Sequence, residues 1–446
     1  MKKRYDHLLV ERNFFRSTST HLVVKGTILG EFHKSMFEYA LEELRRIHPM
    51  LCCVIEVDAK SQISYVHNKE AIFPLTYLEK SKEDHWIEIV KAEENKPFRS
   101  TEEPPIRFFV LVDKFDFDLI IIGHHILGDG LSYAYVFQDF IDIYCNKKKL
   151  EVRETTLITS YKNLPEQSRF DRDVEEYIKY LNEEWDKERV FFSDEEYEKV
   201  YEKYHETNTV DVLTVKVEND DYHELRLQCK QNDVTINTLI FTVFLKAFQD
   251  LMELESSNVT IAMNIRNAMS FQPGRCIGNY ASAFTPLLTY NNEFDIWENA
   301  RHNCKVVSEY IKDAKKSHMV PQLFCQLDCS IIDALTFAAS GSFMTPLIPK
   351  VVPLLSSISS GEGFGISNLG ALNVDLSNSS YELTDFVYIP HATTIYNKTL
   401  GVATMNEQLM ISILFKDLSI PRNTMEAVKN YVEVSLKELS QVLCTV

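Results

Sequence analysis

The sequence predicts a mixed α/β protein built from two domains, and three observations support this class. The 446 residues exceed one ordinary core and suit two domains of about 150 to 220 residues each. Runs of strand length alternate with amphipathic helical patterns in both halves of the chain. Hydrophobic residues make up 45% and charged residues 25% of the chain, which is the composition of a globular protein.

The first half contains strands and helices in alternation. A strand is predicted at 21–28, an amphipathic helix at 32–47, and further strands at 52–57 and 62–66, from the periods of their apolar residues. Segments 106–112 and 117–123 are expected to form a strand pair, because a polar turn joins them. Helical spacing returns at 131–144. We place the N-terminal domain at residues 1–165.

A charged segment separates this domain from the next. Residues 166–207 are rich in Glu, Asp, Lys and Tyr, and a largely charged helix at 173–189 predicts an exposed helical connector. The C-terminal domain then covers residues 208–446. Strands are predicted at 210–217, 259–264 and 281–289, a hairpin at 401–405 and 408–415, and helices at 221–231, 236–251 and 424–439. The 236–251 helix is apolar nearly all round and should be buried.

Charge and composition exclude several classes of function. The formal net charge of −18 repels phosphate backbones, so we expect no nucleic-acid partner. The basic N-terminus lacks an apolar signal region, and no apolar run is long enough for a transmembrane segment. The nine cysteines show no zinc-type spacing and resemble the buried thiols of a reducing compartment. We therefore expect a cytoplasmic protein.

The stretch LIIIGHHILGDGLSY at 119–133 is the strongest candidate for a functional site. His124 and His125 follow a predicted strand, and a Gly-Asp-Gly turn at 128–130 precedes a helix. Successive side chains of an extended segment point in opposite directions, so only one histidine should face a cleft. Three interpretations remain open: one imidazole is a general base, the two histidines bind a metal with Asp129, or both are structural residues capping the helix.

HHILGDG matches the HHxxxDG motif of the condensation and CoA-dependent acyltransferase superfamily. That superfamily includes nonribosomal peptide condensation domains, alcohol acetyltransferases and polyketide-associated acyltransferases. Further segments resemble it in the same order along nearly the whole chain: ALEELRRIHPMLCCVIE, PPIRFFVL, LRLQCKQNDVTINTLIFTVFLKAF, IAMNIRNAM with IGNYAS, GISNLG and GVATMNEQLMISILF. GFGISNLG lacks the DFGWG element of the plant BAHD branch, and no segment resembles a carrier or adenylation domain, so we expect a stand-alone member.

The resemblance implies two chloramphenicol-acetyltransferase-like domains with an active-site tunnel at their interface. It makes His125 the catalytic base and gives structural roles in the active site to other residues of the motif and to its arginine partner. These structural residues are His124, Asp129, Gly130 and Arg266, with Asp129 paired to Arg266. An oxyanion donor or tunnel residue is expected among Ser367, Asn368 and Asn279; the first two lie in what we interpret as a glycine-flanked turn.

We therefore expect an acyltransferase that moves an acyl group from a thioester to a small alcohol or amine. An activated thioester mainly requires an aligned acceptor and a base. The donor is expected to be acyl-CoA or an acyl carrier protein, with no bound metal or other cofactor. Two alternatives stay open: condensation-type amide or ester formation from a carrier-bound donor, and a non-catalytic binding protein of the same fold.

Overall fold

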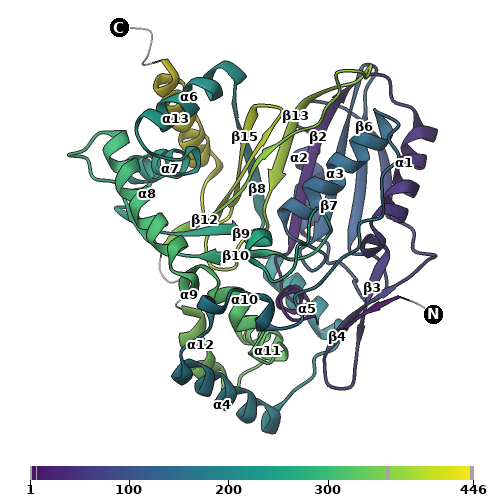
Figure 1. Cartoon of the computed structure of the whole chain (residues 1–446), viewed down its shortest axis with the longest axis vertical. Coiled ribbons are helices and arrows are strands. Elements are labelled where there is room, and N and C mark those ends of the chain that lie inside the picture. The colour runs from purple at the N-terminus through teal and green to yellow at the C-terminus, as the bar shows by residue number, and fades with distance from the viewer. Residues whose placement is uncertain (1–2, 7, 357–361, 442–446) are drawn as a thin grey trace.

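Two β-sheets form the framework of the molecule, and helices cover the outer face of each (Figure 1). The computed structural model describes residues 3–6, 8–356 and 362–441. Helices α1 and α3 lie outside the first sheet, whereas α6, α7, α8 and α13 lie outside the second. The mixed α/β class predicted from the sequence is confirmed.

The N-terminal sheet has five strands and divides two hydrophobic cores. Leu119 and Ile121 face α1 and α3 in one core, whereas Ile120 and Ile122 face the opposite core, which α2 and the second sheet complete. This alternation is what a buried strand with period two produces. The strands, in spatial order, are β13 (Glu382–Ile389), β2 (His21–Leu29), β7 (Asp116–His124), β6 (Ile106–Val112) and β5 (Leu75–Glu79); the helices are α1 (Lys34–Ile47), α2 (His85–Glu94) and α3 (Gly130–Tyr144).

Strand β13 comes from the C-terminal half of the chain but belongs to the N-terminal sheet. It runs antiparallel to β2, with Ile389 opposite Val23 and Glu382 opposite Leu29. It also contacts β14 and β15 of the second sheet, and the Ser412 hydroxyl of β15 donates a 2.6 Å hydrogen bond to the Tyr388 carbonyl oxygen. A division of the chain at residue 208 therefore separates β13 from the sheet that it completes.

The C-terminal sheet is mixed, with β12 parallel to both of its neighbours, β9 and β14. The predicted hairpin is confirmed: Asn406 and Glu407 both have left-handed backbone angles, with φ of 49° and 68°. The strand predicted at 281–289 is two strands, separated at Thr285 and Pro286, because proline cannot donate to the ladder. The strands are β10 (Ala281–Phe284), β11 (Leu287–Thr289), β9 (Ser256–Asn264), β12 (Gly363–Leu372), β14 (Lys398–Met405), β15 (Gln408–Lys416) and β8 (Val210–Val217).

Four helices pack on the outer face of this sheet. They are α6 (Asn219–Gln231), α7 (Ile236–Met252), α8 (Ile296–Lys312) and α13 (Arg422–Gln441). The prediction that the 236–251 helix is buried is confirmed, since Leu239, Phe241 and Phe244 are fully buried. Among the described helices none is by itself long and apolar enough to cross a membrane, and α6 with α7 meets that test only as a pair bent by 97°.

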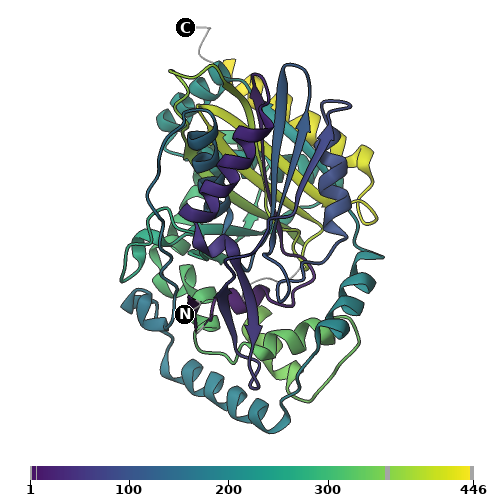
Figure 2. The same ribbon diagram turned by 90° about the vertical axis from the view of Figure 1, so that its right-hand side faces the viewer.

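A helical region closes the lower end of the molecule in the views of Figures 1 and 2. The expected connector helix is present as α4, but its Leu181 and Trp185 are fully buried against α10, α11 and α12. The helices are α4 (Arg172–Glu188), α5 (Asp194–His205), α9 (Ala314–Ser317), α10 (Met319–Phe324), α11 (Ser330–Ala339) and α12 (Ile348–Ser356).

The remaining elements are a small sheet and short 3-10 turns. The sheet is β1 (Arg4–Tyr5), β4 (Ile63–His67) and β3 (Cys53–Val57), and the turns are η1 (Glu11–Phe14), η2 (Pro49–Cys52), η3 (Tyr161–Asn163), η4 (Glu166–Ser168) and η5 (Arg266–Ala268). The cysteines that the structure describes are all free thiols.

Candidate active site

The two adjacent histidines at the end of β7 lie in different environments. His124 is the last residue of β7 and is 1% exposed, whereas His125 is partly exposed. The His124 Nδ1 accepts a 3.0 Å hydrogen bond from the Ile126 N–H, and burial lowers its pKa to about 3. The His125 N–H donates to the Thr20 carbonyl oxygen at 2.8 Å, which ties the turn to the chain just before β2. His125 is therefore the imidazole available for chemistry.

Asn279 fixes the tautomer of His125. The Asn279 Nδ2 donates to the carbonyl oxygens of His125 and Ile126, at 3.0 and 3.2 Å, so both of its hydrogens are engaged. The Asn279 Oδ1 must then be the atom that lies 3.0 Å from His125 Nδ1, and an amide oxygen only accepts. Nδ1 consequently carries the proton, and no group of the described residues bonds to the lone pair of Nε2.

Burial keeps His125 in its neutral form. Removal from water lowers the pKa of His125 below its ordinary value of 6.5, while the Asp129 carboxylate and the Asn279 hydrogen bond oppose this shift only in part. The imidazole is thus unprotonated at neutral pH. A neutral imidazole with a free Nε2 can accept a proton from a hydroxyl or an amine.

Phe14 of η1 stacks on the ring of His125. The two ring centroids are 3.8 Å apart and the planes differ by 10°. This contact covers one face of the imidazole and restricts its rotation. Phe14 had no signal in the sequence, because η1 lies more than a hundred residues before His125 and has no regular pattern.

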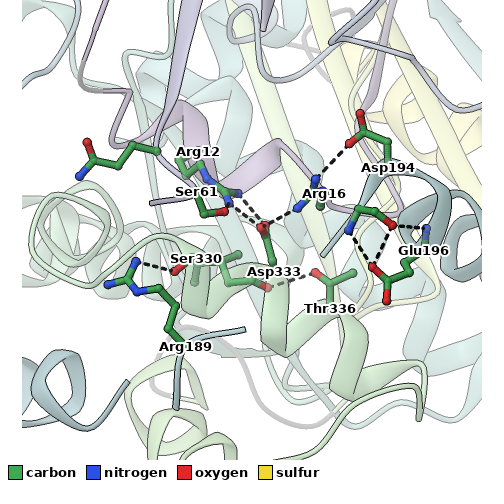
Figure 3. Close-up of polar contacts among 12 residues, drawn as sticks. Arg12, Arg16, Ser61, Arg189, Asp194, Glu196, Ser330, Asp333 and Thr336 are labelled. Atoms are coloured by element: carbon green, nitrogen blue, oxygen red, sulfur yellow. Dashed lines mark hydrogen bonds and ion pairs between the residues drawn. The ribbon is translucent and has the colours of Figure 1, made fainter. Parts of the chain in front are cut away.

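Buried ion pairs hold η1 in this position (Figure 3). Arg12 is 1% exposed, and its Nη1 lies 2.6 Å from Oδ1 of Asp333 on α11. Arg16 lies 3.6 Å from the same carboxylate and 3.0 Å from Asp194 of α5. Figure 3 shows both guanidinium groups converging on Asp333. The stacking of Phe14 on His125 therefore depends on a helix more than 300 residues further along the chain.

A second imidazole, His391, lies beside His125. Its ring centroid is 5.0 Å from that of His125, with an interplanar angle of 81°, and 6.2 Å from that of Phe14. His391 follows β13 by two residues and is partly exposed. Burial and, to a smaller extent, His125 lower its pKa to about 3. Sequence reasoning missed His391, since its place depends on the pairing of β13 with β2.

Asp129 organises the turn that follows the histidines. It caps α3, and it accepts hydrogen bonds from the backbone N–H groups of Ser132 at 2.9 Å and Tyr280 at 3.0 Å. Arg266 donates to its two oxygens at 2.7 and 2.9 Å, so the structure brings the two expected partners together. Burial alone would raise the pKa of Asp129, but Arg266 and the other donors hold it below its usual value. Asp129 is a permanent carboxylate whose oxygens are engaged.

Gly130 allows a close approach of Tyr388. A Cβ atom at Gly130 would lie 2.5 Å from the Tyr388 hydroxyl oxygen, so any larger residue would displace that ring. Tyr388 belongs to β13, the strand that leads to His391. Its hydroxyl also lies 3.1 Å from the Ser367 hydroxyl. The absence of a side chain at Gly130 thus lets α3 pack closely against β13.

Ser367 and Asn368 lie in strand β12 and not in the turn that the flanking glycines suggested. Both pair with β14, opposite Gly401 and Val402. The Asn368 Nδ2 donates to Asn237 at 3.1 Å, and its Oδ1 accepts from Gly370. The glycine signal arises instead from a β-bulge, where Gly370 has a φ of 75°. Ser367 and Asn368 therefore already have other partners.

The arrangement contains no candidate metal centre in the part of the chain that the structure describes. No group of three or more His, Cys, Asp and Glu side chains lies close enough to hold an ion. The chemistry that the described groups can perform is proton transfer and hydrogen bonding, with His125 as the acceptor.

Comparison with known proteins shows the family and the fold of the chain. A segment of the chain is 25% identical over 187 residues to cyclosporin synthetase of Tolypocladium inflatum; it covers 42% of this chain and 1% of that much longer protein. Two solved structures superimpose along nearly their whole length. The first condensation domain of the CDA synthetase has a TM-score of 0.64 at 10% identity, covering 98% of this chain and 96% of its own. Trichothecene 15-O-acetyltransferase from Fusarium sporotrichioides has a TM-score of 0.63 at 12% identity, covering 98% and 95%.

At these identities the structural likeness establishes the fold, which is the condensation and acetyltransferase fold that the sequence predicted. The family model described as Condensation domain matches residues 6–316, well over half of the chain. The matched segment includes His125, Asp129, Arg266 and Asn279. The chain belongs to the Condensation domain family.

Proposed function

We propose that the protein is an acyltransferase that moves an acyl group from a thioester to a hydroxyl or amine, with His125 as general base. The observation that carries this proposal is the tautomer of His125. Its Nδ1 hydrogen is engaged by Asn279, and its Nε2 lone pair has no hydrogen-bond partner in the part of the chain that the structure describes. Family membership supports the reaction class.

The reaction follows from this geometry in two steps. Nε2 of His125 takes the proton of the acceptor as the acceptor oxygen or nitrogen attacks the thioester carbonyl, which gives a tetrahedral oxyanion. The oxyanion then collapses, the carbon–sulfur bond breaks, and the thiolate takes the proton back from His125. Asp129 does not exchange protons, because Arg266 and two backbone N–H groups occupy its oxygens. Its task is to hold the turn.

The donor is a thioester of CoA or of an acyl carrier protein, and the acceptor is a small alcohol or amine. The formal charge of −18 disfavours long-range approach of an acidic carrier protein, and it repels the phosphates of CoA as well, so both donor classes are tested side by side. Amide or ester condensation from a carrier-bound donor uses the same proton transfer. It differs only in what presents the thioester.

The test measures free-thiol release from acyl-CoAs of increasing chain length and from acyl carrier protein, each with and without pooled alcohols and amines. We expect acceptor-dependent release by the wild-type protein and a loss of about 10² to 10⁴ in His125→Ala. The matched control is His302→Ala, which removes an exposed histidine of α8 and should leave release unchanged. Full turnover in His125→Ala would refute the base assignment. Silence of the wild type with both donor classes would favour the non-catalytic alternative.

A further inference from the structure

The proposed reaction needs a hydrogen-bond donor for the carbonyl oxygen as it becomes negative, and each group expected to supply one already has a partner. Both side-chain hydrogens of Asn279 go to backbone carbonyls. The Ser367 hydroxyl meets Tyr388, and the Asn368 amide meets Asn237. A preorganised donor is commonly the largest single contribution to catalysis of this kind. The donor should therefore be a free N–H or O–H beside His125.

His391 has the required position. Its ring stands nearly perpendicular to that of His125, and the two ring centroids are 5.0 Å apart. His125 is the imidazole whose Nε2 is proposed to take the proton. We therefore place the carbonyl group, attacked by an acceptor held at His125, beside His391. His391 is partly exposed, as His125 is.

His391 also has free hydrogen-bonding capacity. Among the described residues its ring makes contacts with His125 and Phe14, and neither of its nitrogens has a hydrogen-bond partner. A half-buried imidazole without partners loses the hydrogen bonds it would have in water. A ligand oxygen at this point would satisfy it.

The protonation state of His391 suits donation. The burial that lowers its pKa to about 3 keeps the ring neutral at physiological pH. A neutral imidazole has one N–H donor and does not compete with His125 for a positive charge. The neighbouring His125 ring can then accept the acceptor's proton and become the only imidazolium of the pair.

We infer, resting on the proposed acyl transfer, that His391 is a second catalytic residue, whose N–H donates a hydrogen bond to the thioester oxyanion while His125 accepts the proton. His391 is not consumed: its proton stays on nitrogen, the oxyanion collapses, and the departing thiolate is protonated from His125. His391 lies outside the residues that the family model matches, 6–316, so this assignment rests on the geometry of this chain.

The experiment compares three proteins: wild type, His391→Ala, which removes the donor, and His391→Gln, which keeps an N–H at a similar reach. With the best thioester and acceptor, we expect His391→Ala to lower kcat by about 10² to 10³ with little change in KM, because the lost interaction exists only in the transition state. His391→Gln should recover at least about tenfold of that loss. The pH at which activity falls on the acid side should stay that of the wild type, because His125 remains the base.

The outcomes distinguish a failure of the His391 inference from a failure of the proposed function. A kcat of His391→Ala within about twofold of wild type, or a glutamine variant no better than the alanine variant, would overturn the inference while leaving the proposed function in place. A wild type that releases no thiol with any donor would overturn both. Thermal unfolding of each variant identifies misfolding, and a misfolded alanine variant leaves the comparison of His391→Gln with His391→Phe to decide in the same way.

Discussion

At the scale of single residues, Asn279 determines how His125 behaves. It presents an uncharged oxygen to Nδ1, so it selects the tautomer without stabilising the imidazolium strongly. If His125 is the base, the wild-type protein should therefore stay active below pH 6.5, because the pKa of His125 is lowered and its neutral form persists until the pH reaches the lowered pKa.

Replacing Asn279 by Asp tests this. A carboxylate beside Nδ1 favours the charged imidazolium and should raise the pKa of His125 by about one unit or more. The acid-side fall in kcat/KM should move to higher pH by the same amount, and thiol release measured across pH gives this shift. Asn279→Leu is the matched control, since it removes the hydrogen bond to Nδ1 and those to the two carbonyl oxygens without adding charge. An unshifted profile in Asn279→Asp would show that Asn279 does not contact the working base.

The sequence identified some of these residues but not others, for a physical reason. His125, Asp129 and Arg266 stand in short motifs whose spacing is local, and the structure brings Asp129 and Arg266 together. Phe14 and His391 reach the site only through packing: one through ion pairs with α11, the other through the pairing of β13. A local pattern cannot encode such contacts.

At the scale of elements, the buried ion pair between Arg12 of η1 and Asp333 of α11 should contribute to stability, and breaking it should lower the free energy of unfolding. Asp333→Ala would leave Arg12 as an unpaired charge that is 1% exposed, which should destabilise the protein by about 3 to 5 kcal/mol and loosen Phe14 from His125. Urea unfolding and thiol release measure the two effects.

The control removes both charges of the Arg12–Asp333 pair at once. The double variant Arg12→Met with Asp333→Leu replaces the pair by apolar groups and should recover most of the lost stability. Arg16 keeps Asp194 as a partner in that protein. If Asp333→Ala unfolds at the same urea concentration as the wild type, the pair does not anchor η1.

The elements that could be predicted are those whose buried face appears in the sequence as a regular spacing of apolar residues. Helices α1, α3, α7 and α13 and the β14–β15 hairpin fall within a few residues of the predicted ranges. Strand β12 was interpreted as a turn, because its glycines are typical of turns. In the sheet, however, these glycines have different tasks: Gly370 forms the β-bulge with its φ of 75°, whereas Gly363 allows a close approach, since a Cβ there would lie 1.9 Å from the Asn258 carbonyl oxygen.

At the scale of the whole molecule, β13 makes the two sheets depend on each other. Residues 1–207 expressed alone would expose the unpaired edge of β2, which invites association with other edges. We expect this fragment to aggregate, and co-expression with residues 208–446 to yield a soluble complex of the size of the intact chain in size-exclusion chromatography. A soluble, monomeric and folded N-terminal fragment would contradict the dependence on β13.

The chain between β13 and β14 passes directly from one sheet to the other, and His391 stands on it. His125 is fixed to the first sheet at the end of β7. His391 follows β13 by two residues, and β13 belongs to the same sheet as β7, so the first sheet sets the separation of the two imidazoles. The chain beyond His391 continues into β14 of the second sheet. A substrate that displaces this connection would move the donor and leave the base in place, so selectivity for size would arise without any contact to the part of the substrate that is too large.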